Sequence, residues 1–501
     1  MPLLLPSHVD VAVIGGGPAG SSAARLLSDW GHSVLLVDRG AGRNPLAESL
    51  PPSATRLLET IGVRQAVDEA GFVTATGNTV WWGDGVMRIE PFPEGKRGYQ
   101  VLSTTFDAVL RQHAAKGGAR VLQPATALGV GTVGTVGSVG DEAHLVTIEL
   151  DGARHEVRAT WVLDCTGRAG FMSRTVSRRV ERAARTVALV GVWERDGGWE
   201  LPDETHTLVE SSPRGWGWSI PVSATTRFFT VMLDPGHARV ADRGGAAAQY
   251  SEEVARLPAL GEVAARGRLT APPWACDATP YAHQPVVAPR TLLVGDAASC
   301  IDPLSSFGVK KALATGWLAA ITVNTARRSP HLTVQATTFY AEREREFERA
   351  ASQRLAALSR DAMGPGDSPF WESRAALAED GDDDDMVQRL RRDADVLQAF
   401  EQLKERPSVA LRRSGHYREE PRLLIRGNQM ALEPHLTMSP FSHGLRYLRG
   451  VDLVTVAAIA TTESDVGGMY DHYVRRNGPI SLPDFLGALS VLVGKGGLEF
   501  T

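Results

Sequence analysis

Cysteine and lysine are scarce in this sequence, and its net charge is small. Each of these observations argues against a class of protein. The 501 residues include three cysteines, Cys165, Cys276 and Cys300, and none belongs to a C-x-x-C pair. This spacing argues against a disulfide framework and against a structural zinc site, so we expect no metal. Basic side chains number 53 and acidic ones 58, for a net charge of −5. Such a balance gives no broad positive field and disfavours nucleic acid as a partner.

The first residues also lack the pattern of a targeting segment. They contain no cationic cluster, and only three consecutive leucines precede Pro6. We therefore expect neither a signal peptide nor a membrane anchor. Free thiols are typical of a reducing compartment, and a cytoplasmic protein without a membrane partner is the expectation.

Glycine, in contrast, is abundant, with 51 residues in the chain. An average protein contains about 7% glycine, so the placement of the excess is informative. One part is a low-complexity run between Leu128 and Asp141, which we interpret as a long hairpin tip. The chain is also several times longer than a usual domain, which predicts two or three packed units.

A second group of glycines follows the first predicted strand. The apolar run Val9–Ile14 leads into a G-x-G-x-x-G turn formed by Gly15, Gly17 and Gly20, and an apolar helical stretch follows. The first glycine allows the tight turn, the second lets the backbone approach a pyrophosphate, and the third lets the helix pack on the strand. The next predicted strand ends in Asp38, whose carboxylate can accept hydrogen bonds from a ribose. A glycine-rich turn alone can bind nothing, but strand, helix, strand and acid together predict a dinucleotide site.

A later segment distinguishes FAD from NAD. The predicted strand Thr291–Val294 ends in Gly295 and Asp296, and a proline-containing loop then leads to a helix that begins near Gly308. The carboxylate can hold ribityl hydroxyls, and the helix N-terminus can stabilise negative charge on the flavin ring. Gly-Asp pairs are common in turns. In combination with the first turn, however, this one favours FAD. A third strand, Trp161–Asp164, also ends in a glycine turn.

These three elements, in this order, resemble the FAD-dependent monooxygenases of the para-hydroxybenzoate hydroxylase type, and more closely the flavin-dependent halogenase branch. That branch has a W-x-W-x-I-P motif and an F-x-x-P-x-x-S-x-G-x-x-x-A motif. The first motif is matched in full by Trp216, Trp218, Ile220 and Pro221. The second is matched by Pro303, Ser306, Gly308 and Ala312, with Cys300 in place of the phenylalanine. A segment around Ser49 resembles the branch's loop after the second strand.

The resemblance implies an α/β fold with a Rossmann-like FAD-binding domain interleaved with an antiparallel-sheet substrate domain. The FAD-binding domain is expected at residues 8–70, 100–175 and 271–335, and the substrate domain at 71–99 and 176–270. A helical region is expected at 336–440 and a winged-helix-like module at 441–501. The residues expected to bind FAD are Gly15, Gly17, Ala19, Gly20, Asp38, Arg39, Ser49, Gly295, Asp296, Pro303, Gly308 and Val309.

Two departures from the halogenase branch bear on the reaction. The branch places a lysine on a strand between the first two motifs, and the corresponding stretch Val73–Trp82 has none; the six lysines of the chain lie elsewhere. Tryptophan halogenases also have a glutamate just before the motif serine, where this chain has Ser305. We therefore predict hydroxylation of an electron-rich aromatic ring through a C4a-hydroperoxyflavin. Two alternatives stay open: a halogenase that recruits another lysine, and a flavin-binding partner protein without turnover.

The residues next to flavin and substrate are less well determined by the sequence. Trp216, Trp218, Ser305 and Ser306 are the candidates, and no general acid or base is assigned. Two tryptophans two residues apart on a strand point to the same face, so they are equally compatible with a core role.

The last sixty residues suggest the substrate. Three predicted helices, the last with Ser481 as its N-cap, and a short strand form a winged-helix-like pattern, whose possible uses include peptide docking and structural capping. With the missing lysine, this architecture resembles the monooxygenases of tryptophylquinone cofactor biogenesis in quinohemoprotein amine dehydrogenase. That resemblance implies a tryptophan side chain in a protein subunit as the substrate, with a small or carrier-bound aromatic as the alternative. The branch also implies a separate flavin reductase that uses NAD(P)H.

Overall fold

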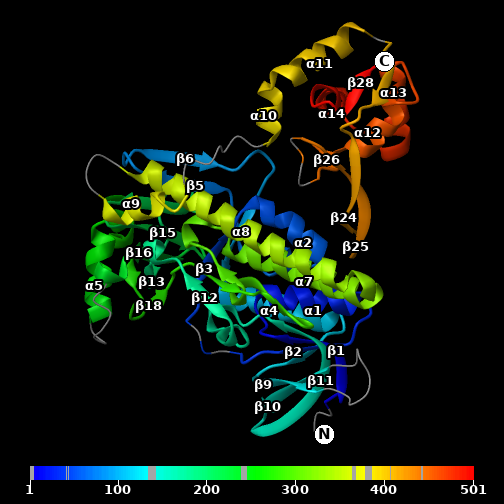
Figure 1. The fold of residues 1–501 in the computed structure, drawn as a ribbon. Helices are drawn as coiled ribbons and strands as arrows, with labels where there is room; N and C mark the ends of the chain where they lie inside the picture. Colours follow the sequence, from blue (N-terminus) through cyan, green and yellow to red (C-terminus); the bar gives the residue numbers. More distant parts are fainter. Residues whose placement is uncertain are drawn as a thin grey trace. The chain divides into compact units, whose positions relative to one another are not determined.

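The computed structural model describes residues 5–40, 42, 44–133, 143–237, 245–363, 368–378, 386–406, 408–439, 441 and 444–501. The chain divides into two compact units, Met1–Glu379 and Asp380–Thr501 (Figure 1). The predicted hairpin tip falls largely on residues 134–142, which lie outside the described residues. Its two arms, β9 (Thr126–Val133) and β10 (Ala143–Leu150), pair antiparallel.

The first unit is built on an eight-stranded sheet with the order β20-β21-β11-β1-β2-β8, to which β10 and β9 are added beside β11. The strands β1, β2, β8, β11 and β21 are parallel neighbours. The strands on this path are β1 (His8–Ile14), β2 (Val34–Val37), β8 (Arg120–Leu122), β11 (Ala153–Asp164), β20 (Val287–Ala288) and β21 (Thr291–Leu293). Apolar β-branched runs, buried on both faces, are typical of such strands. The predicted Rossmann-like domain is confirmed.

Helices cover this sheet. α1 lies beside α7, and α7 lies beside the long α8. Within the described residues the helices of the first unit are α1 (Pro18–Asp29), α2 (Thr55–Ile61), α3 (Arg64–Glu69), α4 (Ser103–Lys116), α5 (Gly245–Ala255), α6 (Pro258–Ala265), α7 (Gly308–Arg328), α8 (Thr333–Ala362) and α9 (Pro369–Ala375). The small residues Ala19 and Gly316 let α1 and α7 approach closely, since a Cβ at Gly316 would lie 2.4 Å from the Ala19 carbonyl oxygen.

A second, mainly antiparallel sheet has the order β17-β13-β16-β15-β14-β5-β6, with β18 also paired to β13. Its strands come from two separated stretches of the chain, as the predicted interleaving requires. They are β5 (Gly77–Trp81), β6 (Met87–Pro91), β13 (Val187–Glu194), β14 (Thr207–Ser212), β15 (Gly215–Pro221), β16 (Thr226–Leu233), β17 (Arg268–Leu269) and β18 (Trp274–Asp277).

Two small sheets complete the first unit. One has the order β3-β7-β4 and the other β12-β19-β22. Their strands are β3 (Ala47–Leu50), β4 (Val73–Ala75), β7 (Gly98–Leu102), β12 (Ser177–Val180), β19 (Tyr281–Gln284) and β22 (Ser299–Cys300).

The second unit has a helical core with a protruding hairpin. Its elements are α10 (Met386–Arg392), α11 (Ala394–Glu405), β23 (Leu411–Arg413), β24 (Arg418–Arg426), β25 (Gln429–Thr437), β26 (Tyr447–Leu448), β27 (Val451–Asp452), α12 (Leu453–Ala460), α13 (Val466–Asn477), α14 (Leu482–Gly494) and β28 (Leu498–Phe500). The predicted N-cap Ser481 accepts a hydrogen bond from the Asp484 N–H, as a capping serine should.

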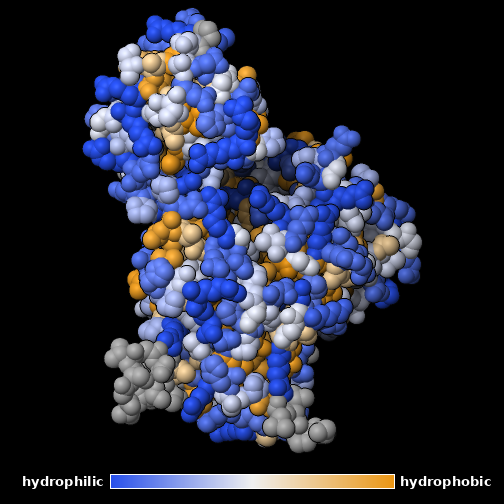
Figure 2. Space-filling view, turned by 90° about the vertical axis from the view of Figure 1, so that its right-hand side faces the viewer, coloured by the Kyte–Doolittle hydropathy of each residue, from blue (hydrophilic) through white to orange (hydrophobic). Residues whose placement is uncertain are grey.

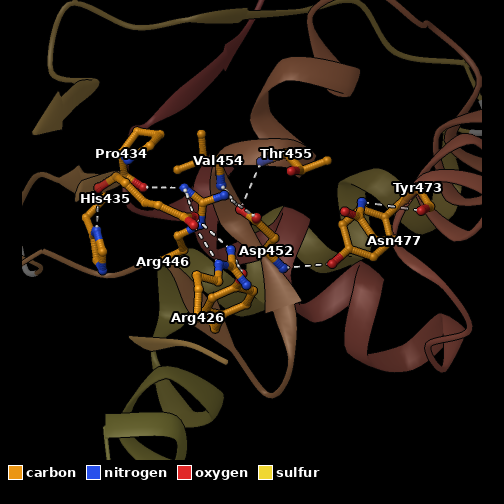
Figure 3. A network of polar contacts seen from close by, with 11 residues as sticks. Arg426, Pro434, His435, Arg446, Asp452, Val454, Thr455, Tyr473 and Asn477 are labelled. Carbon is orange, nitrogen blue, oxygen red and sulfur yellow. Dashed lines mark hydrogen bonds and ion pairs between the residues drawn. The ribbon is translucent and has the colours of Figure 1, made fainter. Parts of the chain in front are cut away.

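A partly buried polar network joins the hairpin to these helices (Figure 3). Arg446 donates to the Pro434 carbonyl and pairs with Asp452, both at 2.7 Å. Asp452 in turn caps α12 and donates its own N–H to the Tyr473 hydroxyl at 2.8 Å. The hairpin is thereby fixed to α12 and α13.

The structure differs from the predicted organisation of the tail in one respect. The region 336–440, expected to be helical, also contains β23, β24 and β25. The last strand, β28, pairs with β23, so the sheet that contains β28 includes residues from before 441. The three helices and the strand are present, while a winged-helix identity stays a prediction.

In the described residues, no helix is long and apolar enough to span a membrane. The face in Figure 2 is largely hydrophilic, with apolar side chains in small patches.

Candidate cofactor site

The G-x-G-x-x-G turn lies between β1 and α1. Gly15 has a φ of +104°, and a Cβ there would lie 2.3 Å from the Cys165 carbonyl oxygen. A Cβ at Gly20 would lie 1.9 Å from the Gly15 carbonyl oxygen, whereas Gly17 faces open space. Gly17 also precedes α1 without any side-chain cap. The turn thus combines two packing glycines with one position that leaves room and free N–H groups for an anion.

Asp38 lies beside this turn at the carboxyl end of β2. Its Oδ2 accepts the Gly16 N–H at 2.6 Å, and its Oδ1 accepts from Gly40 N at 2.7 Å and Gln123 Nε2 at 3.1 Å. The neighbouring Arg39 is exposed. The structure therefore brings the predicted acid to the G-x-G-x-x-G turn and holds its orientation.

Arg111 on α4 is a residue of this site that sequence reasoning missed. Its Nη1 donates to the Gly16 carbonyl oxygen at 3.1 Å, and its Nε is buried without a hydrogen-bond partner among the described residues. The guanidinium brings positive charge to the same turn. The signal available in the sequence was an arginine on the helix that follows the strand Gly98–Leu102, but no local pattern shows that this helix packs against the turn.

The second predicted segment follows β21. Gly295 has a φ of +66°, and a Cβ there would lie 3.0 Å from the Ala19 Cβ. The two predicted segments therefore meet. Asp296 is half-buried, and no hydrogen bond to its carboxylate is found among the described residues. Its carbonyl accepts the Tyr281 hydroxyl at 2.7 Å.

The loop from Pro303 to Gly308 leads to the N-terminus of α7. Ser305 is buried and donates to the Asp302 carbonyl at 2.9 Å, whereas Ser306 is exposed with a φ of +54°. α7 begins at Gly308 without a side-chain cap, and the space around Gly308 is open. The free N–H groups and the positive end of the helix dipole can therefore stabilise a negative ligand group.

A buried ion pair supports the Asp296 turn from behind. Lys311 Nζ donates to the Gly295 and Ser299 carbonyls at 3.0 and 2.6 Å, and lies 3.6 Å from Glu344 Oε2 on α8. Burial raises the pKa of Glu344, and the neighbouring ammonium opposes that rise. The turn is thus fixed to both α7 and α8.

The third glycine turn is organised by Asp164. Its carboxylate accepts five hydrogen bonds, from Thr166 N and Oγ1 and from the N–H groups of Phe171, Met172 and Ser173. Arg168, in the same turn, is held by Asp277 at 2.8 Å and donates to Cys300 Sγ at 2.8 Å. Burial raises the pKa of the Cys300 thiol to about 12, so the thiol is neutral near pH 7.

Ser49 connects the cofactor segments to the second sheet. The Thr207 hydroxyl on β14 donates to Ser49 Oγ at 3.1 Å and accepts from Gln100 Nε2 at 2.9 Å. The Gln100 Oε1 atom is buried without a partner in the described residues. The paired strands β3 and β7 are in this way held to β14, an interior strand of the second sheet.

Trp216 and Trp218 share one face of β15, as their spacing predicts. Their ring centroids lie 5.2 Å apart at 87°. Trp216 is buried, whereas Trp218 keeps exposed surface. Both belong to an apolar cluster that also contains Leu46 before β3 and Leu304 from the loop before α7. This face of the sheet therefore meets the segments that carry Ser49 and Pro303.

A small solvent-open hollow adjoins the turn before α7 and is lined in part by Tyr281, Cys300 and Asp302. Burial raises the pKa of Asp302 to about 6. Among the described residues, no group of three or more His, Cys, Asp or Glu side chains is arranged to hold a metal ion.

Comparison with known proteins gives the family. The FAD binding domain family matches residues 8–362. A tryptophan 2-halogenase from Chondromyces crocatus is 30% identical over 362 residues, which cover 67% of this chain and 65% of that protein. A flavin-dependent halogenase of Armillaria mellea, armH1, is 28% identical over 67% of this chain and 68% of that protein. The chain thus spans slightly less than two thirds of the tryptophan 2-halogenase.

Solved structures show the same fold. The flavin-dependent halogenase CmlS has a TM-score of 0.75 at 22% identity and covers 99% of this chain and 96% of its own. The chondrochloren halogenase CndH has a TM-score of 0.68 at 26% identity, over 80% of this chain and 90% of its own. The peptidyl tryptophan dihydroxylase QhpG has a TM-score of 0.67 at 21% identity, over 98% and 99%.

The uncapped helices α1 and α7, the open space at Gly17 and the acids beside both turns fit a dinucleotide that carries a flavin. The chain has the fold of the flavin-dependent halogenases and belongs to the FAD binding domain family, with FAD as its cofactor.

Proposed function

We propose that the two glycine turns hold opposite parts of FAD. The pyrophosphate takes the open space at Gly17 beside the α1 N-terminus, and Asp38 binds the adenosine ribose. Asp296 binds the ribityl chain, and the N-terminus of α7 at Gly308 faces the pyrimidine edge of the flavin. Two observations support this assignment: neither helix has a side-chain cap, and the Asp296 carboxylate has no hydrogen bond among the described residues. The remaining predicted contacts, from Ala19, Arg39, Ser49, Pro303 and Val309, are part of the same proposal.

We further propose that the reaction is hydroxylation of an electron-rich aromatic ring. Bound FAD, once reduced, supplies activated oxygen, and the protein orients the ring and excludes water. The observation that carries this proposal is the composition of β4 and β5, which have no ionisable side chain. Halogenases of the branch that the sequence resembles place a lysine on the corresponding strand. Here Thr79 is buried and bonded to His206 at 3.0 Å, so this strand holds no group that could handle a hypohalous acid.

The substrate side of the site is aromatic and apolar. Trp218 and Leu304 keep exposed surface within a largely buried cluster, as a wall for an aromatic ring requires. We propose a tryptophan side chain within a protein or peptide as the substrate. The support is the fold shared with the peptidyl tryptophan dihydroxylase over 98% of this chain, together with the missing lysine, since the halogenase CmlS shares the fold over 99% as well. A separate NAD(P)H-dependent reductase supplies the reduced flavin in this proposal.

The test is turnover of the full chain with reduced flavin and heavy-oxygen-labelled dioxygen, read by mass spectrometry. A tryptophan-containing peptide and free tryptophan are compared in the presence of bromide. Label in the peptide product, without bromine, is the expected result. Label only in a small aromatic product would move the substrate assignment. A flavin-loaded protein with no product from any aromatic substrate would instead favour a flavin-binding partner protein.

Halogenation is the second candidate, because Lys310, unlike its neighbour Lys311, lies at the start of α7 outside the buried ion pair with Glu344. Lys310 is in the first turn of α7, donates to Ser53 Oγ at 3.0 Å and lies 4.8 Å from the Phe307 ring centroid. Burial lowers its pKa, and Arg354 lowers it further. A brominated product that Lys310→Met abolishes and the exposed control Lys96→Met retains would establish this function and contradict hydroxylation.

A further inference from the structure

β6 is an edge strand with unusual side chains. It pairs with β5, and with no other strand in the described part of the chain. Every residue of β6 is exposed. Val86, Met87 and Ile89 are 60%, 49% and 50% exposed. A free edge offers unpaired N–H and C=O groups to another strand, and exposed apolar residues favour such pairing.

The hydrogen-bond pattern shows which groups the edge offers. Phe92 N donates to the Thr76 carbonyl at 2.7 Å, so in the alternation of an antiparallel pair the main-chain groups of Arg88 and Glu90 face β5. Those of Met87, Ile89 and Pro91 face outward. Pro91 offers a carbonyl but has no N–H.

We propose that β6 pairs antiparallel with β6 of a second copy of this chain, about a twofold axis at Ile89. The two Ile89 residues exchange N–H···O bonds, and the Met87 N–H of each copy donates to the Pro91 carbonyl of the other. Arg88 of each copy then stands opposite Glu90 of the other. The strand is thus complementary to itself in hydrogen bonds and in charge, and an isologous twofold contact has this property.

Charge also selects this register over its neighbours. Moving the axis by one residue toward the N-terminus places Arg88 opposite Arg88, and moving it the other way places Glu90 opposite Glu90. Like charges directly opposite each other destabilise a strand pair. Within one copy, Arg88 is only loosely paired, at 3.7 Å from Asp84 and 3.9 Å from Glu90. Both side chains are therefore available to a second copy.

The dimer continues the sheet, because β5 and β6 of one copy join β6 and β5 of the other. On the face of the paired strands opposite Arg88 and Glu90, Met87 of one copy contacts Pro91 of the other, and the two Ile89 side chains contact each other across the axis. Val86 and Phe92 face each other at the two ends. Apolar contacts thus flank the paired charges on both sides.

Charge reversal tests the proposal on the full flavin-loaded chain, with mass measured by light scattering and sedimentation over a concentration series. The wild type is expected to be a dimer. Arg88→Glu places two acids opposite each other, Glu90→Arg places two bases opposite each other, and each weakens the dimer about tenfold or more. The double variant Arg88→Glu/Glu90→Arg restores both ion pairs and hence the dimer.

Mixing the two single variants gives the most specific result. The two acidic side chains of the Arg88→Glu copy then face the two basic side chains of the Glu90→Arg copy, so a heterodimer forms from two weakened partners. Val334→Arg, at a 73% exposed site on α8, is the matched control and leaves the dimer intact. A monomeric wild type, single variants that dimerise like the wild type, or a mixture that stays monomeric would each overturn the proposal. Because the changed residues are exposed, flavin content and circular dichroism stay those of the wild type.

Discussion

The buried pair Lys311–Glu344 gives a prediction whose magnitude follows from the structure. The two side chains are 2% and 3% exposed and join α7 to α8 behind the Asp296 turn. Lys311→Met removes the cation and two hydrogen bonds, to the Gly295 and Ser299 carbonyls. Breaking one partner of a buried pair costs about 3–5 kcal/mol, because the other charge is left uncompensated. We expect the free energy of unfolding of the first unit to fall by that amount.

Tryptophan fluorescence in a urea titration measures this loss selectively. All 11 tryptophans precede residue 380, so their emission reports the first unit. A double-mutant cycle measures the coupling between the two side chains. The double variant Lys311→Met/Glu344→Leu removes both charges, and we expect its loss of stability to be smaller than the sum of the two single losses by about 1–3 kcal/mol. FAD affinity also falls in Lys311→Met, because the turn that carries Asp296 loses its support. Additivity within about 0.5 kcal/mol, or a Lys311→Met as stable as the exposed control Lys116→Met, would refute the reasoning.

Four further variants probe the cofactor site. Gly20→Ala places a Cβ 1.9 Å from the Gly15 carbonyl oxygen, so we expect its free energy of unfolding in urea titration to fall by about 1–3 kcal/mol or more. Gly17 faces open space, so Gly17→Ala keeps the stability of the apoprotein. Its FAD affinity, measured by flavin fluorescence, falls about tenfold or more. Arg111→Met removes a hydrogen bond to the Gly16 carbonyl and a positive charge beside the G-x-G-x-x-G turn, and we expect FAD to bind about tenfold more weakly because the proposed pyrophosphate site loses that charge. Burial raises the pKa of Asp302 to about 6, so the neutral carboxyl contributes stability that is present below about pH 4 and lost as the pH rises to about 6, worth about 3 kcal/mol. Asp302→Asn removes that dependence, and an unchanged pH profile of the unfolding free energy would contradict it.

The sequence predicted the cofactor domain well because its signals are local. The strand, turn and helix around Gly15, and the turn at Gly295, are each contained within about thirty residues, the size of a βαβ unit. A positive φ at Gly15 and Gly295 and the close approach at Gly20 each require glycine. Such local requirements for glycine can be recognised in one short stretch of sequence.

Contacts between distant segments have no such local pattern and were not predicted. Arg111 reaches Gly16 from another helix, 95 residues further along the chain. The strand β28 pairs with β23, so the tail's small sheet depends on residues before the predicted module boundary at 441. A lysine and a glutamate far apart in the sequence suggest nothing by themselves, and only the packing of α7 on α8 makes Lys311 and Glu344 a pair.

The tryptophan motif combines a local feature that the sequence predicts with a tertiary feature that it does not. A period of two places Trp216 and Trp218 on one face of β15, and this part of the prediction is confirmed. The pattern treats the two indoles as equivalent, yet Trp216 is 2% exposed and Trp218 keeps free surface, because neighbouring strands and the loop before α7 cover them unequally. A substrate ring can stack only on an indole that has surface to offer. Trp218 is therefore the residue of the pair on which substrate discrimination should depend, and Trp216 the one whose loss should first cost stability.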